Sequence, residues 1–237
     1  MPKIKRDHQT VLKFGPDVRR EEGNALILAA SLGVPVPRVH DISTSEDGSC
    51  TIRMDYVDGI CLEDAWENMH DEDKKSIAQQ LRRILAMMRS AQPSSSTPHI
   101  GACDGPARDI RHITDYDGGP FQSEGDFNTF VLLRVAKGAP HIINKILEEA
   151  LRTLPEHRIV FSHADLSPRN IIIRNSQIIA LLDWEYAGWY PEYWEYVKFL
   201  MNPSGCKGWH DLASDIFEIS YPSEFVAHQA VARFQRV

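Results

Sequence analysis

Residues 158–190, RIVFSHADLSPRNIIIRNSQIIALLDWEYAGWY, hold the pattern from which the rest of the sequence can be interpreted. Three apolar runs separated by polar loops predict three short strands, at 159–161, 171–173 and 178–182. Polar side chains stand where these strands begin or end, namely Asp165, Asn170 and Asp183. Because a hairpin brings the ends of its strands together, we expect these three side chains to lie close to one another.

These three side chains are the set that phosphoryl transfer requires. One carboxylate must orient the attacking hydroxyl and accept its proton, while a second carboxylate and an amide oxygen hold Mg²⁺ on the nucleotide phosphates. The pattern H-x-D-L-x-x-x-N, followed by a hairpin and then Asp, is that of the kinase catalytic and metal loops. In the alternative interpretation, Asp165 and Asn170 cap a turn and Asp183 is an ordinary acid at the end of a strand.

Composition and charge narrow the class of protein. The 237 residues allow one large domain or two small lobes, and a hydrophobic content of 43% can supply a sizeable core. A net charge of −7 argues against nucleic acid as a partner and suits a neutral or cationic ligand. The cysteines form no C-x-x-C pair, so neither a zinc site nor a redox motif is indicated. Without an apolar signal region or a run of about 18 apolar residues, we expect a cytoplasmic protein with no membrane partner.

The N-terminal part predicts a strand followed by a helix. The strand is VLKF at 11–14, and the helix is expected from Asp17, which can cap it, to a stop at Gly33. Lys13 lies on the strand and Glu22 in the helix. In a kinase, such a lysine and glutamate pair to grip the α- and β-phosphates, and we predict that pair here. The alternative is an exposed lysine and a solvated glutamate.

A predicted hinge separates two lobes. The segment MDYVDG at 54–59 follows a predicted strand and ends in a glycine, which is typical of a kinase hinge, although an ordinary strand end is also compatible with it. We therefore expect a small N-terminal lobe, 1–57, and a larger C-terminal lobe, 58–237. Residues 92–120 are expected to be rich in loops. Periodic apolar positions predict helices at 71–91, 127–136, 142–154, 194–201, 209–218 and 223–234.

Several stretches between about residue 10 and about residue 200 resemble the aminoglycoside phosphotransferase family. They are VLKFG, VPVPRV, RMDYVDG, FSHADLSPRN and LLDWEYAGWYPEYWEY, the last being especially similar to fungal members. The resemblance implies an α+β, bilobal, protein-kinase-like fold with a mainly helical C-terminal lobe and an ATP-dependent small-molecule kinase. Ser167 in the loop, Trp184-Glu185 after the metal-loop aspartate and the lack of an A-P-E segment favour a small-molecule kinase over a protein kinase.

The same resemblance implies roles for individual residues. Asp165 is expected to be the catalytic base, and Asn170 and Asp183 to bind Mg²⁺. His163 is expected to support the catalytic loop. The nucleotide phosphates are expected to contact Lys13, which Glu22 holds in place. The nucleotide base is expected to bond to the backbones of Asp55 and Val57 and to lie in a pocket lined by Met54.

Two departures from the family pattern carry consequences. Ala164 stands between the loop His and Asp, where the family commonly has glycine; because protein kinases carry Arg there, we expect the backbone to tolerate a Cβ. Only ten residues, without a glycine, precede Val11, and two strands of about five residues with a turn do not fit into them. We therefore expect a truncated N-terminal lobe with an absent or very short phosphate lid. A catalytically weak pseudokinase that binds a nucleotide or a partner is the alternative function.

The segment 184–196 is dense in aromatic and acidic side chains, and it follows Asp183 directly. Aromatic faces and carboxylates together favour a cationic ligand, so we expect a small acceptor that carries a hydroxyl and at least one amine. The residues expected to contact it are Glu185, Trp189, Glu192 and Glu195. The alternative is that these side chains serve packing or cap the next helix.

Overall fold

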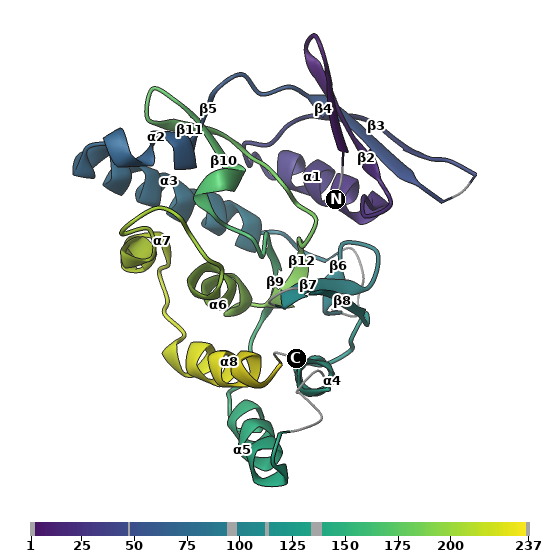
Figure 1. Ribbon diagram of the computed structural model, residues 1–237, viewed down its shortest axis with the longest axis vertical. Coiled ribbons are helices and arrows are strands. Elements are labelled where there is room, and N and C mark those ends of the chain that lie inside the picture. Colours follow the sequence, from purple (N-terminus) through teal and green to yellow (C-terminus); the bar gives the residue numbers. More distant parts are fainter. Residues whose placement is uncertain (1–2, 47, 94–98, 112–113, 134–138, 236–237) are drawn as a thin grey trace.

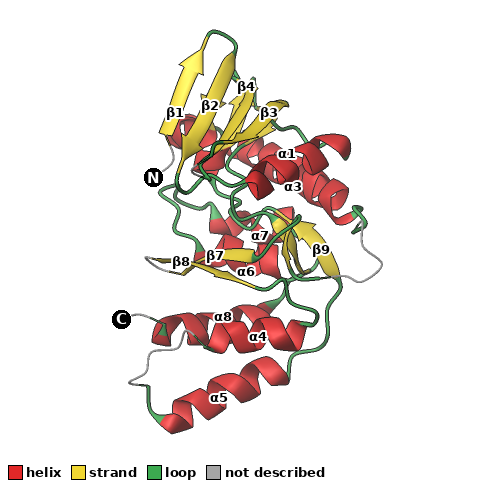
Figure 2. Cartoon of the chain, turned by 90° about the vertical axis from the view of Figure 1, so that its right-hand side faces the viewer, coloured by secondary structure: helices red, strands yellow, loops and turns green. Residues whose placement is uncertain are grey.

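An antiparallel sheet of four strands forms one end of the molecule (Figures 1 and 2). The computed structural model describes residues 3–46, 48–93, 99–111, 114–133 and 139–235. The strands lie in the order β1-β2-β4-β3. Their bounds, in that order, are Lys3–Asp7, Thr10–Gly15, Cys50–Asp55 and Val39–Thr44. Helix α1 (Arg20–Ser31) packs against β3 and β4, so that the predicted lysine strand and glutamate helix belong to one unit.

Helix α1 begins at Arg20 rather than at the predicted Asp17. The reason is local, because the backbone N–H of Val18 donates to the carbonyl of Gly15 at 3.2 Å and the chain makes a turn before the helix starts. The predicted stop holds: Gly33 has φ +80°, the left-handed conformation in which glycine commonly ends a helix.

Strand β1 was not predicted, since all five of its residues are exposed and carry no apolar alternation. It forms a hairpin with β2, in which Ile4 pairs with Lys13. Within the described residues, one strand therefore precedes the strand that carries Lys13. The sequence analysis predicted that two strands would not fit there. The hairpin turn runs through His8, which has φ +46°, and it contains no glycine.

The remainder of the chain combines helices with short strands. One sheet has the order β11-β10-β5 and another the order β6-β12-β9, while β7 and β8 form a separate hairpin. The bounds of these strands are β5 Ile60–Cys61, β6 Gly101–Ala102, β7 Ala107–Arg111, β8 Thr114–Gly118, β9 Ile159–Ser162, β10 Ile171–Arg174, β11 Gln177–Leu181 and β12 Gly188–Pro191. The expectation that 92–120 is rich in loops did not anticipate β6, β7 and β8, which all lie within it.

The predicted helices are present, α6 with the predicted bounds and the others with shifted ends. They are α3 Asp71–Arg89, α4 Glu124–Leu132, α5 His141–Arg152, α6 Trp194–Met201, α7 Ala213–Ile216 and α8 Pro222–Phe234, with a short additional α2 at Leu62–Ala65. Helix α4 begins earlier than predicted because Ser123 caps it, its Oγ accepting from the backbone N–H of Asp126 at 3.1 Å. Residues 134–136 of that prediction lie outside the described residues.

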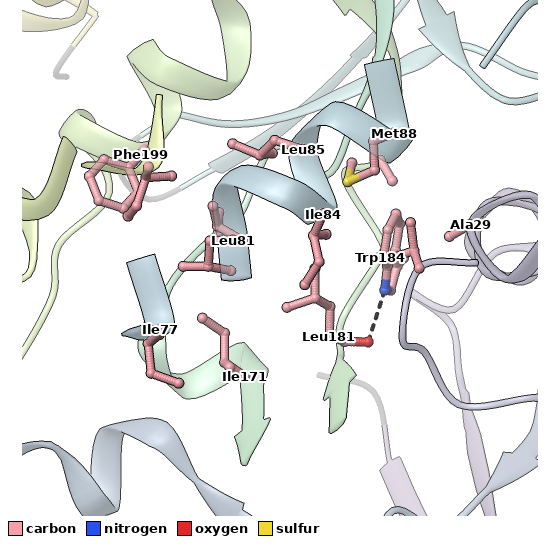
Figure 3. Packing of buried hydrophobic residues seen from close by; sticks show 14 of the residues in the cluster. Ala29, Ile77, Leu81, Ile84, Leu85, Met88, Ile171, Leu181, Trp184 and Phe199 are labelled. Atoms are coloured by element: carbon pink, nitrogen blue, oxygen red, sulfur yellow. Dashed lines mark hydrogen bonds between the residues drawn. The ribbon is translucent and has the colours of Figure 1, made fainter. Parts of the chain in front are cut away.

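The predicted apolar stripe of α3 lies at the centre of the largest core cluster (Figure 3). Five of its side chains are at most 5% exposed, namely Ile77, Leu81, Ile84, Leu85 and Met88. Each such burial stabilises the fold by up to about 1.5–3 kcal/mol. Trp184 packs in the same cluster, and its indole Nε1–H donates to the carbonyl of Leu181 at 3.0 Å (Figure 3). The core thereby fixes β11 and the turn that carries Asp183.

Polar contacts of α1 and of the residue before it connect the N-terminal unit to the rest of the chain. The guanidinium of Arg19, just before α1, makes two hydrogen bonds of 3.0 and 2.6 Å to the carboxylate of Asp117 in β8. Further along α1, Nδ2 of Asn24 donates to the carboxylate of Asp104 at 2.5 Å. These contacts hold the helix that carries Glu22 against the β7–β8 side of the molecule.

Candidate active site

A cavity of about 530 Å³ lies between the N-terminal sheet and the strands that flank the catalytic loop. Its lining comes from β1, β2, α1, the end of β4 and the segment after it on one side, and from β5, α2, β10 and the residues just after β11 on the other. Seven of the predicted site residues line it: Lys13, Glu22, Met54, Asp55, Val57, Asn170 and Asp183. The structure thus brings the expected nucleotide and metal residues to one place.

Lys13 joins the two walls of this cavity. Its Nζ lies 2.7 Å from Oε1 of Glu22 and 2.7 Å from Oδ1 of Asp183. Lys13 is 6% exposed and Glu22 3%, which excludes the alternative of an exposed lysine and a solvated glutamate. Oε2 of Glu22 is buried without a hydrogen-bond partner among the described residues.

Burial and charge act in opposite directions on this cluster. Burial disfavours the charged lysine, but the carboxylates of Glu22 and Asp183 outweigh it and raise the pKa of Lys13. Burial also raises the pKa of Glu22, and the ammonium of Lys13 opposes that effect. With one cation against two carboxylates, the cluster has capacity for further positive charge.

Buried hydrogen bonds hold the catalytic loop in shape. The imidazole of His163 is fully buried; its Nδ1 accepts from the backbone N–H of Asp165 at 3.2 Å and its Nε2 donates to the carbonyl of Leu182 at 3.0 Å. The ring therefore links the loop to the turn before Asp183, which is the supporting position expected for it. Ala164 has φ +65°, a left-handed conformation that strains a residue with a Cβ.

The carboxylate of Glu195 lies beneath this strained turn. It accepts the backbone N–H of His163 at 2.6 Å and that of Ala164 at 3.1 Å. Glu195 is 2% exposed, and burial raises the pKa of its carboxyl while the loop N–H groups oppose the shift. The side chain stabilises the loop from within.

Asp165 is 2% exposed. Nδ2 of Asn170 donates to its Oδ2 at 2.9 Å and to its backbone carbonyl at 3.0 Å. Because the amide nitrogen of Asn170 faces Asp165, the amide oxygen is turned away from it. Asn170 and Asp183 line the same cavity.

The donor set suits a magnesium ion held partly by a ligand. Within the described ranges, no cluster of three or more His, Cys, Asp or Glu side chains is arranged to hold a metal. Mg²⁺ is commonly bound by only one or two protein carboxylates together with substrate phosphates and water. Asp183 has a side chain 36% exposed and φ +62°, the kind of sparsely populated backbone conformation that occurs at functional sites.

The four residues predicted to contact an acceptor do not gather at one place. Glu185 lies near the cluster around Lys13, with Oε2 3.6 Å from Nη1 of the buried Arg108. Burial and the neighbouring Asp183 raise the pKa of Glu185, whereas Lys13 and Arg108 oppose the shift. Of the four, Glu185 is the one that the structure places beside Asp183, a predicted metal ligand.

The other three have contacts that explain them structurally. Trp189 is 4% exposed and packs against Phe161. Glu192 follows β12 at the end of the β9–β12 pair away from the catalytic loop, and its carboxylate lies 3.3 Å from Nε of Arg158. With Glu195 bound to the loop backbone, the contacts of these residues favour the packing interpretation over the predicted acceptor contact.

Sequence reasoning missed two residues that touch Asp165. Nη2 of Arg169 lies 2.8 Å from each oxygen of that carboxylate, and Nδ2 of Asn202 lies 2.9 Å from Oδ1. Arg169 could have been found, since it stands four residues after Asp165 in the same loop. Asn202 lies beyond the end of α6 and gives no sequence signal.

The sheet, the helical remainder and the lysine cluster between them define a protein-kinase-like α+β fold, as solved structures confirm. A thermostable mutant of aminoglycoside phosphotransferase APH(4)-Ia matches with a TM-score of 0.66 at 15% identity, over 96% of this chain and 78% of that one. Its complex with ADP and hygromycin B matches with a TM-score of 0.66 at 14% identity, over 98% and 83%. The GDP complex of a mutant aminoglycoside 2'-phosphotransferase-IIIa gives 0.63 at 16% identity, over 96% and 76%.

The sequence profile described as the phosphotransferase enzyme family matches residues 4–224, and the chain belongs to that family. The predicted fold class and the predicted enzyme class, phosphotransferase, are thereby confirmed. No curated protein matches the sequence.

Proposed function

We propose that this protein transfers the γ-phosphoryl group of ATP to a hydroxyl of a small acceptor, with Mg²⁺ as cofactor. The observation that carries the proposal is the cavity that brings Lys13, Glu22, Asn170 and Asp183 together, with Asp165 hydrogen-bonded directly behind Asn170. The two lobes, 1–57 and 58–237, and the fungal type suggested by 181–196 are parts of this proposal.

The nucleotide is assigned to the cavity. The base lies against Met54 and the backbone of Asp55 and Val57, and the phosphates lie toward the ammonium of Lys13. The relatives support this placement by analogy, since APH(4)-Ia forms complexes with ADP and AMP-PNP, whereas the 2'-phosphotransferase-IIIa structure holds GDP. A comparison of thermal stabilisation by MgATP and by MgGTP tests the choice of base.

Mg²⁺, when bound, neutralises charge on the phosphates; Asn170 Oδ1 and the Asp183 carboxylate are its protein ligands in this proposal. Asp165 accepts the proton of the acceptor hydroxyl and orients its oxygen toward the γ-phosphorus. His163 and Glu195 keep the backbone around Asp165 in place. Glu22 positions Lys13.

An amine-bearing acceptor is the substrate class that the charges favour. Glu185 adds a carboxylate beside Asp183, and the chain has a net charge of −7. APH(4)-Ia is known in a complex with hygromycin B, an aminoglycoside-type ligand of that relative. Among the described residues, no helix is long and apolar enough to cross a membrane, and a small-molecule acceptor requires no membrane contact.

The test is an ATP-consumption screen over hydroxylated amines, including hygromycin B, alongside neutral polyols and anionic sugars. Turnover with amines and a loss of about 10² to 10⁴-fold in Asp165→Asn would support the proposal. Good turnover with the anionic sugars and poor turnover with amines would contradict the substrate class.

A pseudokinase is the second candidate, favoured by the single strand that precedes β2 within the described residues. It predicts stabilisation by MgATP without consumption of ATP in any member of the screen.

A further inference from the structure

The carboxylate of Asp165 is fully occupied by donors from its own chain. Arg169 Nη2 lies 2.8 Å from Oδ1 and 2.8 Å from Oδ2. Asn202 Nδ2 lies 2.9 Å from Oδ1, and Asn170 Nδ2 lies 2.9 Å from Oδ2. Each oxygen therefore accepts two hydrogen bonds, and a carboxylate offers about four acceptor positions. A substrate hydroxyl can donate to Asp165 only after one of these donors has moved away.

The two amides are held in place by further bonds. Asn170 is 6% exposed and also donates to the backbone carbonyl of Asp165 at 3.0 Å. The backbone of Asn202 is fixed on both sides, since its N–H donates to Lys198 at 2.9 Å and its carbonyl lies 3.2 Å from Nε2 of His210.

Arg169 differs from both amides. Its side chain is 41% exposed, whereas that of Asp165 is 3% exposed. Among the described residues, the rest of its guanidinium has no hydrogen bond or ion pair. The long arginine side chain is therefore the donor that can leave without breaking other contacts.

We propose, building on the phosphoryl transfer proposed above, that Arg169 is a catalytic residue. It caps Asp165 while no nucleotide is bound, and it turns onto the transferred phosphoryl group when MgATP occupies the cavity. The acceptor oxygen then bonds to the γ-phosphorus, and the bond from the γ-phosphorus to the β,γ-bridging oxygen breaks with its electron pair staying on ADP. The hydroxyl proton passes to the uncovered Asp165.

The distance that the guanidinium must cover is small. An attacking oxygen bonded to Asp165 lies about 3 Å from the carboxylate and about 3–3.5 Å from the phosphorus. Because the acceptor oxygen takes the position that the guanidinium vacates, the phosphorus lies about 3–3.5 Å from the guanidinium's present position. The phosphoryl oxygens then lie within about 6 Å of it, a distance that rotation about the outer side-chain bonds of an arginine can span. A planar guanidinium binds phosphoryl oxygens in a bidentate manner, and the charge it meets is spread over three equatorial oxygens in the transition state.

The experiment measures binding rather than turnover. The affinity for MgADP is compared with that for MgADP plus aluminium fluoride, which mimics the transferring phosphoryl group, in wild type and in Arg169→Ala. We expect unchanged MgADP affinity and about 10² to 10³-fold weaker binding of the fluoride complex, as for the loss of one preorganised donor to a transition state. Added guanidinium ion should restore part of the loss, and Arg169→Lys should lose less than Arg169→Ala.

Arg174→Ala is the matched control. Arg174 stands in β10, is 56% exposed at its side chain and contacts Asp58, so both affinities should stay at the wild-type values. Equal losses for MgADP and for the fluoride complex, no loss, or tighter binding in Arg169→Ala would overturn the assignment of Arg169 alone. A wild-type protein that binds neither ligand would instead overturn the proposed function itself.

Discussion

Glu195→Gln is the substitution that best separates support of the catalytic loop from contact with an acceptor. The carboxylate accepts two backbone N–H groups, from His163 and Ala164. Glutamine keeps one acceptor oxygen and replaces the other with an NH₂ group that faces an N–H donor. At least one charge-assisted bond is lost, worth about 1.5–3 kcal/mol, and a buried N–H is left unpaired.

We therefore expect Glu195→Gln to lower the free energy of unfolding by about 2 kcal/mol, which for a chain of this size lowers Tm by about 4–8 °C. Because the loop also carries Asp165, a displacement of about 1 Å would lower kcat by about 10²-fold, while acceptor KM stays unchanged. Urea denaturation, thermal melts and steady-state kinetics measure these effects.

Glu192→Gln is the matched control for this experiment. Its partner Arg158 has a side chain that is 70% exposed, and such pairs contribute only about 0–1 kcal/mol. Wild-type stability in Glu195→Gln combined with a raised acceptor KM would refute the structural role and return this residue to the acceptor site.

The remaining predictions concern the cavity and the carboxylates around it. Lys13→Met should remove most MgATP binding without unfolding the protein, because it deletes the phosphate contact, and calorimetric titration measures this. Asp183→Ala should abolish the magnesium-dependent part of the thermal shift with ATP; an undiminished shift would exclude this metal ligand. Asn202→Ala should lower kcat with little change in ATP affinity, since Asn202 helps to orient the carboxylate of Asp165 and does not line the cavity. The raised pKa of Glu185, caused first by burial and then by Asp183, means that its proton stabilises the fold below about pH 4.5. That contribution is lost as pH rises through the raised pKa, so Glu185→Gln should show a smaller loss of Tm over the same range.

Local patterns made much of the fold predictable, together with the grouping of Lys13, Glu22, Asn170 and Asp183 around one cavity. The catalytic loop and the metal loop are short segments in which residue type and spacing correspond to the chemistry. Lys13 and Glu22 were found because a lysine on a strand and a glutamate in the helix that follows match the kinase pattern. The core stripe of α3 was found for the same reason.

The features that were not predicted depend on tertiary contacts that the sequence does not show. Strand β1 is exposed throughout, so no alternation marks it. Asn202 meets Asp165 only through the packing of α6. Trp189 and Glu195 belong to a segment of aromatic and acidic residues whose composition is compatible both with binding a cation and with packing in the core. The burial of each side chain distinguishes these two roles, and the sequence does not show that burial.

The left-handed turn at Ala164 determines how freely this position can change in evolution. Its conformation costs about 1–2 kcal/mol for a residue with a Cβ. Glycine would relieve that cost, but it would give up about 0.8 kcal/mol of buried methyl and about 0.5–1 kcal/mol of backbone entropy. These contributions nearly cancel, because Ala164 is 1% exposed and packs in the second core cluster. Alanine and glycine are therefore close to neutral replacements for each other here, so a substitution in either direction leaves the stability of the fold nearly unchanged.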